Sequence, residues 1–137
     1  GAVRVPAFGC NYLKCDVGCS VRNGCTHAHY KCYVYVERDQ LALGWSRDRI
    51  VEAINELGVP CYQGCCSEVY LEKAFEHTSW QPAEGLPVAR QLGEDSVMFL
   101  IHPTLTVAEI EKSCEAIENV LKLASRIPGL SIQANQS

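Results

Sequence analysis

The sequence has no cluster of basic side chains. Of its 137 residues, 20% are charged, and the formal net charge is −4. Proteins that bind nucleic acid or an anionic membrane surface usually carry a concentrated patch of lysine and arginine. We therefore expect neither nucleic acid nor a membrane among the partners of this chain.

Long apolar runs and export signals are also missing. The longest apolar runs, such as 97–101, are far shorter than the ~20 residues that cross a bilayer as a helix. The first residues show no basic stretch followed by an apolar one, which is the pattern of a secretion signal. These absences indicate a cytoplasmic protein. The length indicates one domain, large enough to bury a core without metals or disulfides.

Short catalytic and nucleotide-binding motifs are absent. The sequence contains no glycine-rich phosphate loop, no Gly-x-Ser-x-Gly and no His-Glu-x-x-His. Its nine cysteines include no Cys-x-x-Cys and match no zinc-site spacing. We interpret them first as reduced thiols packed like small apolar side chains, then as a metal site. A disulfide scaffold ranks last, because nothing marks the chain for export.

Individual residues also fail to form a catalytic set. His27 and His29 would point to one face of a strand, but two ligands do not make a zinc site. Cys65 and Cys66 precede a helix start that would stabilise a thiolate, yet no base lies nearby in sequence. An imine lysine needs a dry pocket, whereas the lysines here fall on polar helical faces, at a strand border or in a loop. They are Lys14, Lys31, Lys73, Lys112 and Lys122. We therefore expect no catalytic residue and no metal ligand in this chain.

Four segments have the composition of β-strands. Residues 32–36 and 96–101 are apolar and rich in β-branched or aromatic side chains, as buried strands are. Residues 3–5 and 59–63 form shorter segments. Pro60 restricts the latter to a strand start or to the edge of a sheet.

A first helix is predicted between Ser46, an N-cap, and Gly58, a left-handed C-cap. Its apolar face consists of Ile50, Val51, Ile54 and Leu57.

Two short helices are predicted before the last strand. Ser67 can cap one that runs to Phe75. Pro87 suits the first turn of the other, which Gly93 stops.

The last helix has the clearest pattern. Thr106 and Glu109 form a capping box, in which each side chain bonds the backbone N–H of the other. Glu118 and Lys122 form a favourable pair on the outer face, and the helix ends at Pro128 and Gly129. One apolar stripe runs along the inner face: Val107, Ile110, Cys114, Ile117, Leu121 and Ala124.

The elements follow the order strand, helix, strand, short helices, strand and long helix. This order predicts a two-layer α/β (α+β) domain: a small three- to four-stranded sheet, largely antiparallel or mixed, with helices on one face. We divide the chain into an irregular cysteine-rich leader (1–25, a loop at 8–24), the domain itself (26–126) and a polar tail (127–137).

Five stretches together resemble the C-terminal small domain of the DegT/StrS-type nucleotide-sugar aminotransferases. They occur in order, with compatible spacing, over about residues 26–125. The stretches are Thr26-His-Ala-His-Tyr-Lys-Cys-Tyr-Val-Tyr-Val36, Gly44-Trp-Ser-Arg-Asp-Arg-Ile50 with Ala53-Ile-Asn-Glu-Leu-Gly-Val-Pro60, Gly64-Cys-Cys-Ser-Glu-Val-Tyr-Leu-Glu-Lys-Ala-Phe75, Leu86-Pro-Val-Ala-Arg-Gln-Leu92 and Ile101-His-Pro-Thr-Leu-Thr106. The chain departs from the pattern at His29 and Cys32, where aromatic residues are usual, and at Cys65, where a small hydroxyl residue is usual.

The resemblance implies a fold like the small domain of fold-type I aminotransferases, which are homodimers. A large N-terminal domain in that family binds pyridoxal phosphate and holds the imine lysine, and the small domain closes over the substrate. The parent enzyme would move an amino group from glutamate or a similar donor to a keto-sugar nucleotide. This chain would lack the large domain, bind no cofactor itself and not be catalytic alone.

The turn after the short predicted strand at 59–63 is the expected substrate lip. By resemblance it borders the active site, and a turn followed by a helix start could offer N–H groups to an anionic or hydroxyl-rich ligand. Its residues are Gln63, Gly64, Cys65, Cys66, Ser67 and Glu68. The alternative is an ordinary capped helix start.

Two other functions stay open. One is a free-standing binding or interaction module derived from the same domain, and the other is a cysteine-based thiol or metal-binding protein. We also expect the isolated chain to form a homo-oligomer. The strand at 97–101 is apolar on both faces, and Leu123 and Ile127 lie off the helical stripe.

Overall fold

The computed structural model describes residues 1–5, 30–64 and 66–126. Several predictions concern residues outside these ranges: the leader beyond residue 5 with its loop at 8–24, the tail at 127–137 with the helix stop at Pro128 and Gly129, and the single residues Lys14, His27, His29, Cys65 and Ile127.

The chain forms one four-stranded antiparallel sheet in the order β1–β2–β4–β3. The strands are β1 (Val3–Arg4), β2 (Lys31–Val36), β3 (Cys61–Tyr62) and β4 (Ser96–Leu100). All four were predicted within a residue or two of these bounds. The short strand β3 lies at the edge of the sheet, and Pro60 directly precedes it, where a missing N–H costs no ladder hydrogen bond.

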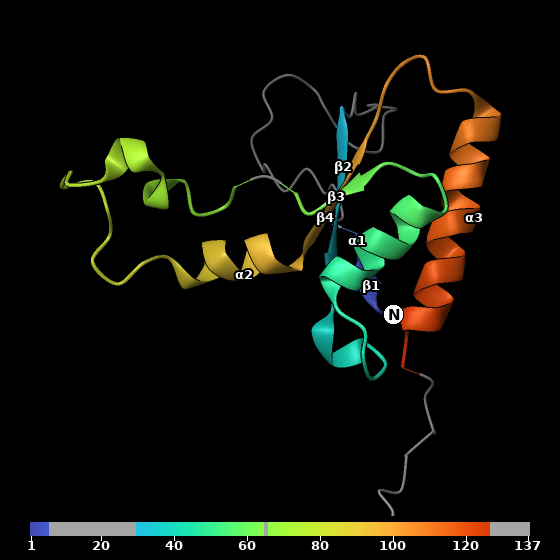
Figure 1. Cartoon of the computed structure of the whole chain (residues 1–137), viewed down its shortest axis with the longest axis horizontal. Coiled ribbons are helices and arrows are strands. Elements are labelled where there is room, and N and C mark those ends of the chain that lie inside the picture. The colour runs from blue at the N-terminus through green and yellow to red at the C-terminus, as the bar shows by residue number, and fades with distance from the viewer. Residues whose placement is uncertain (6–29, 65, 127–137) are drawn as a thin grey trace, which may run out of the picture.

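Two helices, α1 (Arg47–Glu56) and α3 (Val107–Ala124), cover one face of this sheet (Figure 1). The strand register places Val34 opposite Val97, so that both side chains point to the same face. The apolar core lies between the helices and this face, and its buried members are Ala2, Val36, Leu41, Ile50, Ile54, Val59, Cys61, Val97, Ala116, Val120 and Ala124. The predicted two-layer α+β class is confirmed.

The ends of α1 follow from local sequence. The Ser46 hydroxyl oxygen accepts a hydrogen bond from the Arg49 N–H at 3.2 Å, as an N-cap does. Gly58 follows the helix with φ +76°, the left-handed geometry that glycine adopts without strain. Ile50 and Ile54 are fully buried, whereas Leu57 is exposed and takes no part in the predicted apolar face.

The predicted apolar stripe of α3 is only half correct. In its second half, Ala124 is buried and Ile117 and Leu121 are partly buried against the core, although the central buried row is Ala116, Val120 and Ala124. Val107 is 71% exposed, Ile110 is 50% exposed, and Cys114 is also exposed. The reason is length: the last turns of α3 lie against α1 and the sheet, and its first turns extend beyond them (Figure 1).

The C-terminal end of α3 also differs from the prediction. The helix ends at Ala124 rather than at Pro128. The chain becomes extended at Ser125, which pairs with Leu41 in an isolated β-bridge. The Arg126 N–H donates to the Gln40 carbonyl at 2.8 Å, so that tertiary pairing replaces further helical hydrogen bonds.

Between β3 and β4 the chain leaves the sheet and returns, over residues 63–95, which we call the arm. In Figure 1 the arm projects on the side of the sheet away from α1 and α3. It contains two single 3₁₀ turns, Val69–Leu71 and Lys73–Phe75, and the helix α2 (Pro87–Asp95).

Two predictions for the arm are wrong. Ser67 caps no helix, because the segment after it forms the two 3₁₀ turns and neither has a side-chain cap. Gly93 does not stop α2, which continues to Asp95. Gly93 instead gives room for a close contact: a Cβ atom built there would lie 2.0 Å from the Ser67 hydroxyl oxygen.

The predicted capping box of α3 is present in full. Thr106 Oγ1 accepts from the Glu109 N–H at 3.3 Å, and Glu109 Oε2 accepts from the Thr106 N–H at 2.8 Å. The hydrogen bond from the Thr106 N–H, and a second one from the Thr106 hydroxyl to the same oxygen at 2.7 Å, lower the pKa of Glu109, the backbone N–H contributing most. A lowered pKa in the folded chain means that this contribution is present above the ordinary carboxyl pKa and is lost as the pH falls.

We expect Thr106→Ala to lower the free energy of unfolding by about 1 kcal/mol, because a helix N–H loses its acceptor. Urea denaturation of the full chain at neutral pH measures this change. Val107→Ala is the matched control, since Val107 is the exposed next residue. It should change stability by less than about 0.5 kcal/mol. Equal losses in both variants would contradict the capping role.

Candidate functional site at the root of the arm

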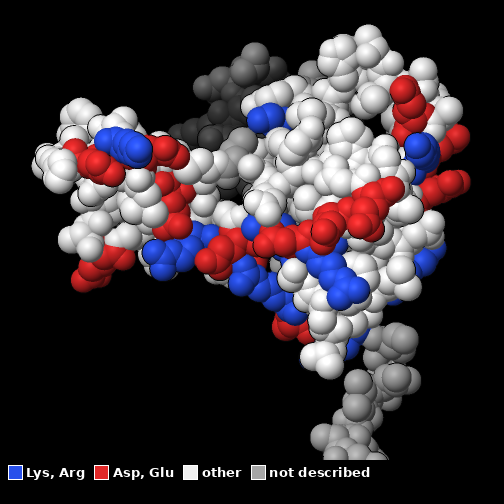
Figure 2. All heavy atoms as spheres, viewed as in Figure 1, with Lys and Arg blue, Asp and Glu red and all other residues white. Residues whose placement is uncertain are grey.

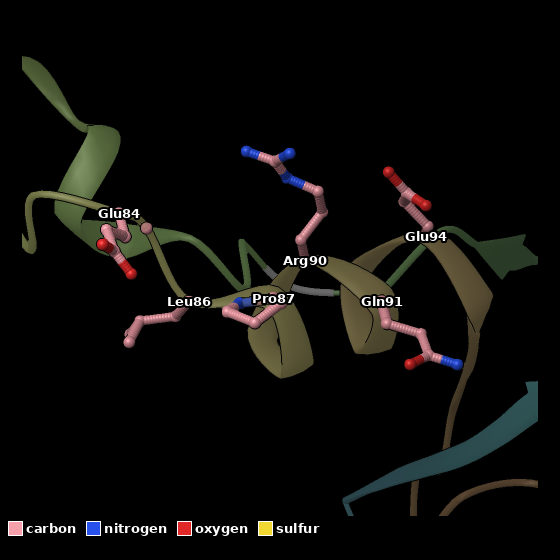
Figure 3. A pocket seen from close by; sticks show the side chains of 7 residues that line it. Glu84, Leu86, Pro87, Arg90, Gln91 and Glu94 are labelled. Carbon is pink, nitrogen blue, oxygen red and sulfur yellow. The ribbon is translucent and has the colours of Figure 1, made fainter.

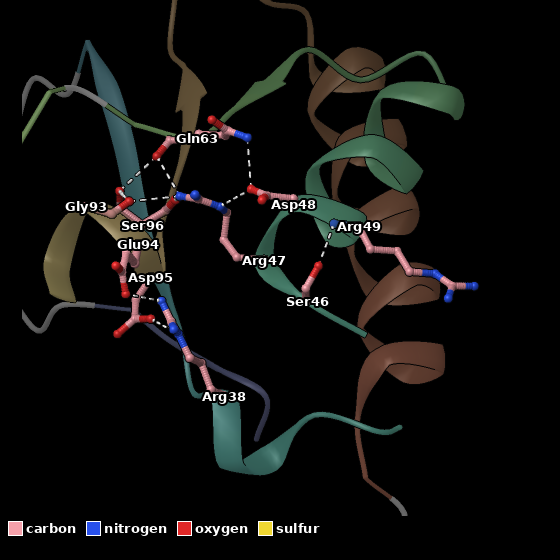
Figure 4. A network of polar contacts seen from close by, with 10 residues as sticks. All are labelled: Arg38, Ser46, Arg47, Asp48, Arg49, Gln63, Gly93, Glu94, Asp95 and Ser96. Carbon is pink, nitrogen blue, oxygen red and sulfur yellow. Dashed lines mark hydrogen bonds and ion pairs between the residues drawn. The ribbon is translucent and has the colours of Figure 1, made fainter. Parts of the chain in front are cut away.

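The side chain of Arg47 lies where the arm leaves and rejoins the sheet (Figure 4). It extends from the first residue of α1 and is only 15% exposed. Its Nη1 donates to three backbone carbonyls, those of Gln63 at 3.1 Å, Gly93 at 2.9 Å and Ser96 at 3.0 Å. One guanidinium therefore joins the departing and returning limbs of the arm to the start of a core helix.

Three further contacts close the same network. Arg47 Nε donates to Asp48 Oδ1 at 2.6 Å, and this oxygen also accepts from the Gln63 amide at 2.8 Å. Ser96, which is 5% exposed, donates from Oγ to the Gln63 carbonyl at 2.9 Å. Gly64 has φ +92°, and a Cβ there would lie 2.4 Å from Ser96 Oγ. Only glycine fits this position, both for its backbone and for its neighbours.

A second arginine links the arm to the body of the domain. Arg38, in the 3₁₀ turn Arg38–Gln40 after β2, donates to Glu94 at 3.0 Å and to Asp95. The hydrogen bond to Asp95 is the main cause that raises the pKa of Arg38. The arginine and Glu94 are both more than half exposed, so the pair contributes little stability. Figure 2 shows acidic and basic side chains interspersed along this junction.

Farther along the arm, Glu68 holds the two limbs together. Its Oε1 accepts from the Tyr70 hydroxyl at 2.6 Å and from Arg90 Nε at 3.3 Å. The Tyr70 oxygen in turn accepts from the Leu86 N–H at 3.0 Å. Glu68 is therefore bound by partners within the arm.

Neither thiol with a perturbed pKa is suited to nucleophilic attack. Cys66 donates to Glu72 Oε1 at 3.3 Å, and this hydrogen bond is the main cause that raises the pKa of the thiol. Burial raises the pKa of Cys61 to about 11. Both groups are thus held in the thiol form at neutral pH, whereas a reactive cysteine needs the thiolate.

The structure does not gather the predicted lip residues around one ligand. Gln63 and Gly64 lie at the root of the arm, whereas Ser67 and Glu68 face α2. Cys66 is exposed beside Glu72, and Cys65 lies outside the described residues. Their role as substrate contacts stays a prediction.

A cavity of about 280 Å³ lies along the start of α2 (Figure 3). This volume is slightly below the range of about 300–1,000 Å³ that is usual for small-molecule sites. None of the lip residues lines this cavity, whose walls are Glu84, Gly85, Leu86, Pro87, Arg90, Gln91 and Glu94.

Sequence reasoning missed Arg47 and Ser96. A signal for the arginine was present: it occupies the first turn of α1, where the helix dipole disfavours a cation. An unfavourable residue at such a position indicates a compensating contact elsewhere. Nothing in the sequence around Ser96 suggests its role.

The described residues do not fit a pyridoxal phosphate site. An imine lysine is buried in a dry pocket. Lys73, Lys112 and Lys122 are exposed on this structure, and Lys31 is half-buried beside the Tyr30 ring. Within residues 1–5, 30–64 and 66–126, no group of three His, Cys, Asp or Glu side chains could hold a metal ion. In the same ranges, no helix is long and apolar enough to cross a membrane.

Comparisons with solved structures find aminotransferases. One from Psychrobacter cryohalolentis is 60% identical over 71% of this chain, with a TM-score of 0.67, and the match spans 25% of that enzyme. A DegT DnrJ EryC1 StrS aminotransferase from Brucella abortus is 24% identical over 65% of the chain and 21% of its own, with a TM-score of 0.50. The aminotransferase TlmJ from Streptoalloteichus hindustanus is 17% identical over 88% of the chain and 26% of its own, with a TM-score of 0.60.

No protein-family model matches the sequence, and comparison with curated proteins gives no match. The two structures below 25% identity show a shared fold, whereas the Psychrobacter enzyme also shares most of its aligned residues with this chain. The predicted resemblance is confirmed: the chain is similar to about a quarter of an aminotransferase and has the fold of that portion. These findings support an aminotransferase-derived domain.

We expect Glu72→Gln to speed the alkylation of Cys66 severalfold at mildly alkaline pH. Loss of the carboxylate removes the main cause of the raised thiol pKa, so more thiolate forms. Peptide mass spectrometry after timed iodoacetamide treatment measures the rate in a Cys65→Ser background, with fragment ions that distinguish Cys66 from Cys61.

Cys114, an exposed thiol on α3, is the internal control in the same sample. Its rate should not change, and neither should the Cys66 rate in the neighbouring variant Glu76→Gln. An unchanged Cys66 rate in Glu72→Gln, or an equal rise at Cys114, would contradict the assigned hydrogen bond.

Proposed function

We propose that this chain is the small-domain portion of a pyridoxal-phosphate-dependent aminotransferase that acts on keto-sugar nucleotides. The observation that carries the proposal is the 60% identity to an aminotransferase over 71% of the chain. The substrate class rests on the five sequence stretches that resemble the DegT/StrS-type enzymes. Pyridoxal phosphate is proposed because aminotransferase chemistry depends on this cofactor.

In this proposal the chain is not catalytic alone. This view is supported by the exposure of Lys73, Lys112 and Lys122 and by the raised pKa values of the Cys61 and Cys66 thiols. The cofactor and its lysine belong to a large domain of the same enzyme, which is the first partner of this chain. The other proposed partner is a second copy of the same chain. The four described cysteines are all free, in keeping with the reducing cytoplasm as the compartment.

The arm is the part of this domain that we assign to the substrate. Of the predicted lip residues that the structure describes, Gln63 and Gly64 lie at the root of the arm, and Ser67 and Glu68 lie farther along it beside α2. Backbone N–H groups and the polar side chains of this turn would then orient the sugar nucleotide rather than take part in proton transfer.

A chimeric enzyme tests the proposal. In it, residues of this chain replace the segment of the Psychrobacter aminotransferase with which they align. With 60% of the aligned residues identical, we expect the chimera to bind pyridoxal phosphate and to convert it to the amine form when glutamate is added, within about tenfold of the parent rate. The conversion is measured as the change in the absorbance of the bound cofactor.

Two controls accompany the chimera. The Psychrobacter enzyme truncated before the exchanged segment should show no conversion. The isolated 137-residue chain, mixed with pyridoxal phosphate and reduced with borohydride, should show no stoichiometric adduct at any single lysine. A folded but inactive chimera, or such an adduct on the isolated chain, would overturn the proposal.

The proposed self-association can be tested on the isolated chain. Exposed apolar side chains on α2 and α3, such as Val88 and Leu123, favour burial against a second copy. We expect light scattering under reducing conditions to give at least twice the chain mass, and Leu123→Glu to lower it. Asn119→Glu, an exposed polar position on the same helix, is the control. A monodisperse monomer at high concentration would refute the association.

A further inference from the structure

The described residues of the arm contribute no fully buried side chain to the domain. No described residue from Gln63 to Asp95 is buried, and the core cluster takes none of its members from this range. Elsewhere in the domain, closely packed buried side chains fix one element against another. The described arm has no such fully buried side chain. Apart from the approach of α2 to β2, the orientation of the described arm therefore depends on polar contacts at its root.

Within itself the arm is well connected. The Glu68 carboxylate, the Tyr70 hydroxyl and the Leu86 N–H form a chain of hydrogen bonds between the two limbs. Gln81 Nε2 donates to the Tyr70 carbonyl at 3.0 Å, and Ser67 packs against Gly93. These contacts hold the arm as a unit whether or not its root is fixed.

At the root, Arg47 is the side chain that contacts both limbs and the core helix at once (Figure 4). Its partly buried position strengthens these charge-assisted hydrogen bonds. In the second link, Arg38 and Glu94 are both more than half exposed, so this ion pair is screened by salt. Asp95 is less exposed, but it and Glu94 both belong to the returning limb, so Arg38 does not join the two limbs. Arg47 is therefore the attachment that holds both limbs.

We propose that Arg47 is a positioning residue that fixes the orientation of the whole arm relative to the sheet. Without its guanidinium, the arm keeps its internal contacts and reorients about Gln63–Gly64 and Gly93–Ser96. The consequence for the substrate lip rests on the proposed function, whereas the orientation of the arm does not.

The chemistry requires arginine. The planar guanidinium reaches Asp48 through Nε while Nη1 serves three carbonyls on a different side. A lysine ammonium is a single point and cannot hold both sets of partners in this geometry. Arg47→Lys should therefore restore the orientation only in part.

Residual dipolar couplings of the isotopically labelled 137-residue chain test the orientation directly. In the unchanged protein, the N–H vectors of α2 and α3 should fit one common alignment. In Arg47→Met, the couplings of α2 should fall about twofold relative to those of α3, because reorientation averages them. Hydrogen exchange of the Leu86 amide and of the α3 amides should stay the same, since the arm and the core remain folded.

Arg49→Met is the matched control. Arg49 lies on the same helix, donates to the Gly44 carbonyl at 2.9 Å, stacks on Trp45 and points away from the arm (Figure 4). This variant should leave the common alignment intact, and Arg47→Lys should fall between it and Arg47→Met. One common alignment in Arg47→Met, or faster exchange in α3 as well as in the arm, would overturn the proposal.

The chimeric enzyme separates this inference from the proposed function. There, Arg47→Met should lower kcat/KM for the sugar acceptor more than for glutamate. If the α2 couplings fall and the two kcat/KM values fall equally, Arg47 positions the arm but the turn is not a substrate lip. If the couplings do not fall, the positioning role is refuted whatever the kinetics show.

Discussion

The placement of the arm depends on the guanidinium group of Arg47. Three backbone carbonyls converge on its Nη1, and Asp48 accepts from its Nε. A cation in the first turn of a helix is opposed by the helix dipole. Asp48, in the same turn, offsets this cost and also binds Gln63. The start of α1 is therefore arranged around a contact to another part of the chain.

This contact divides the molecule into two parts held by different forces. The sheet, α1 and α3 share one apolar core and are stabilised by burial. The arm has no buried side chain among its described residues and keeps its shape through hydrogen bonds and ion pairs. A domain built in this way can hold the polar groups of the arm outside the apolar core at a defined position.

Local signals predicted the fold well. The strand composition, the Ser46 cap and the Thr106–Glu109 capping box each depend on residues close together in sequence, and the structure contains all of them. The errors came where tertiary contacts decide. Gly93 has the composition of a helix stop, but the Ser67 contact across the arm sets its role. The stripe on α3 satisfies helical periodicity along its whole length, but only half of the helix meets a partner.

The network at the root could not be predicted for a more basic reason. The carbonyls that bind Arg47 belong to residues 16, 46 and 49 positions away, and a carbonyl is the same whatever the side chain. The sequence therefore carries no mark of these acceptors. Gly64 is different, because its geometry excludes every other residue and the glycine is visible in the sequence. A glycine in a turn can have many causes, however, so its presence alone does not predict the contact with Ser96.

The absence of buried side chains in the described arm has a consequence for divergence among related enzymes. Substitutions in a core are constrained because each neighbour must still fit. Residues of the arm escape this constraint, apart from the few at its root and along its internal hydrogen bonds. A lineage can therefore change the sequence and length of the arm, while the sheet and its two helices continue to provide the stability of the domain.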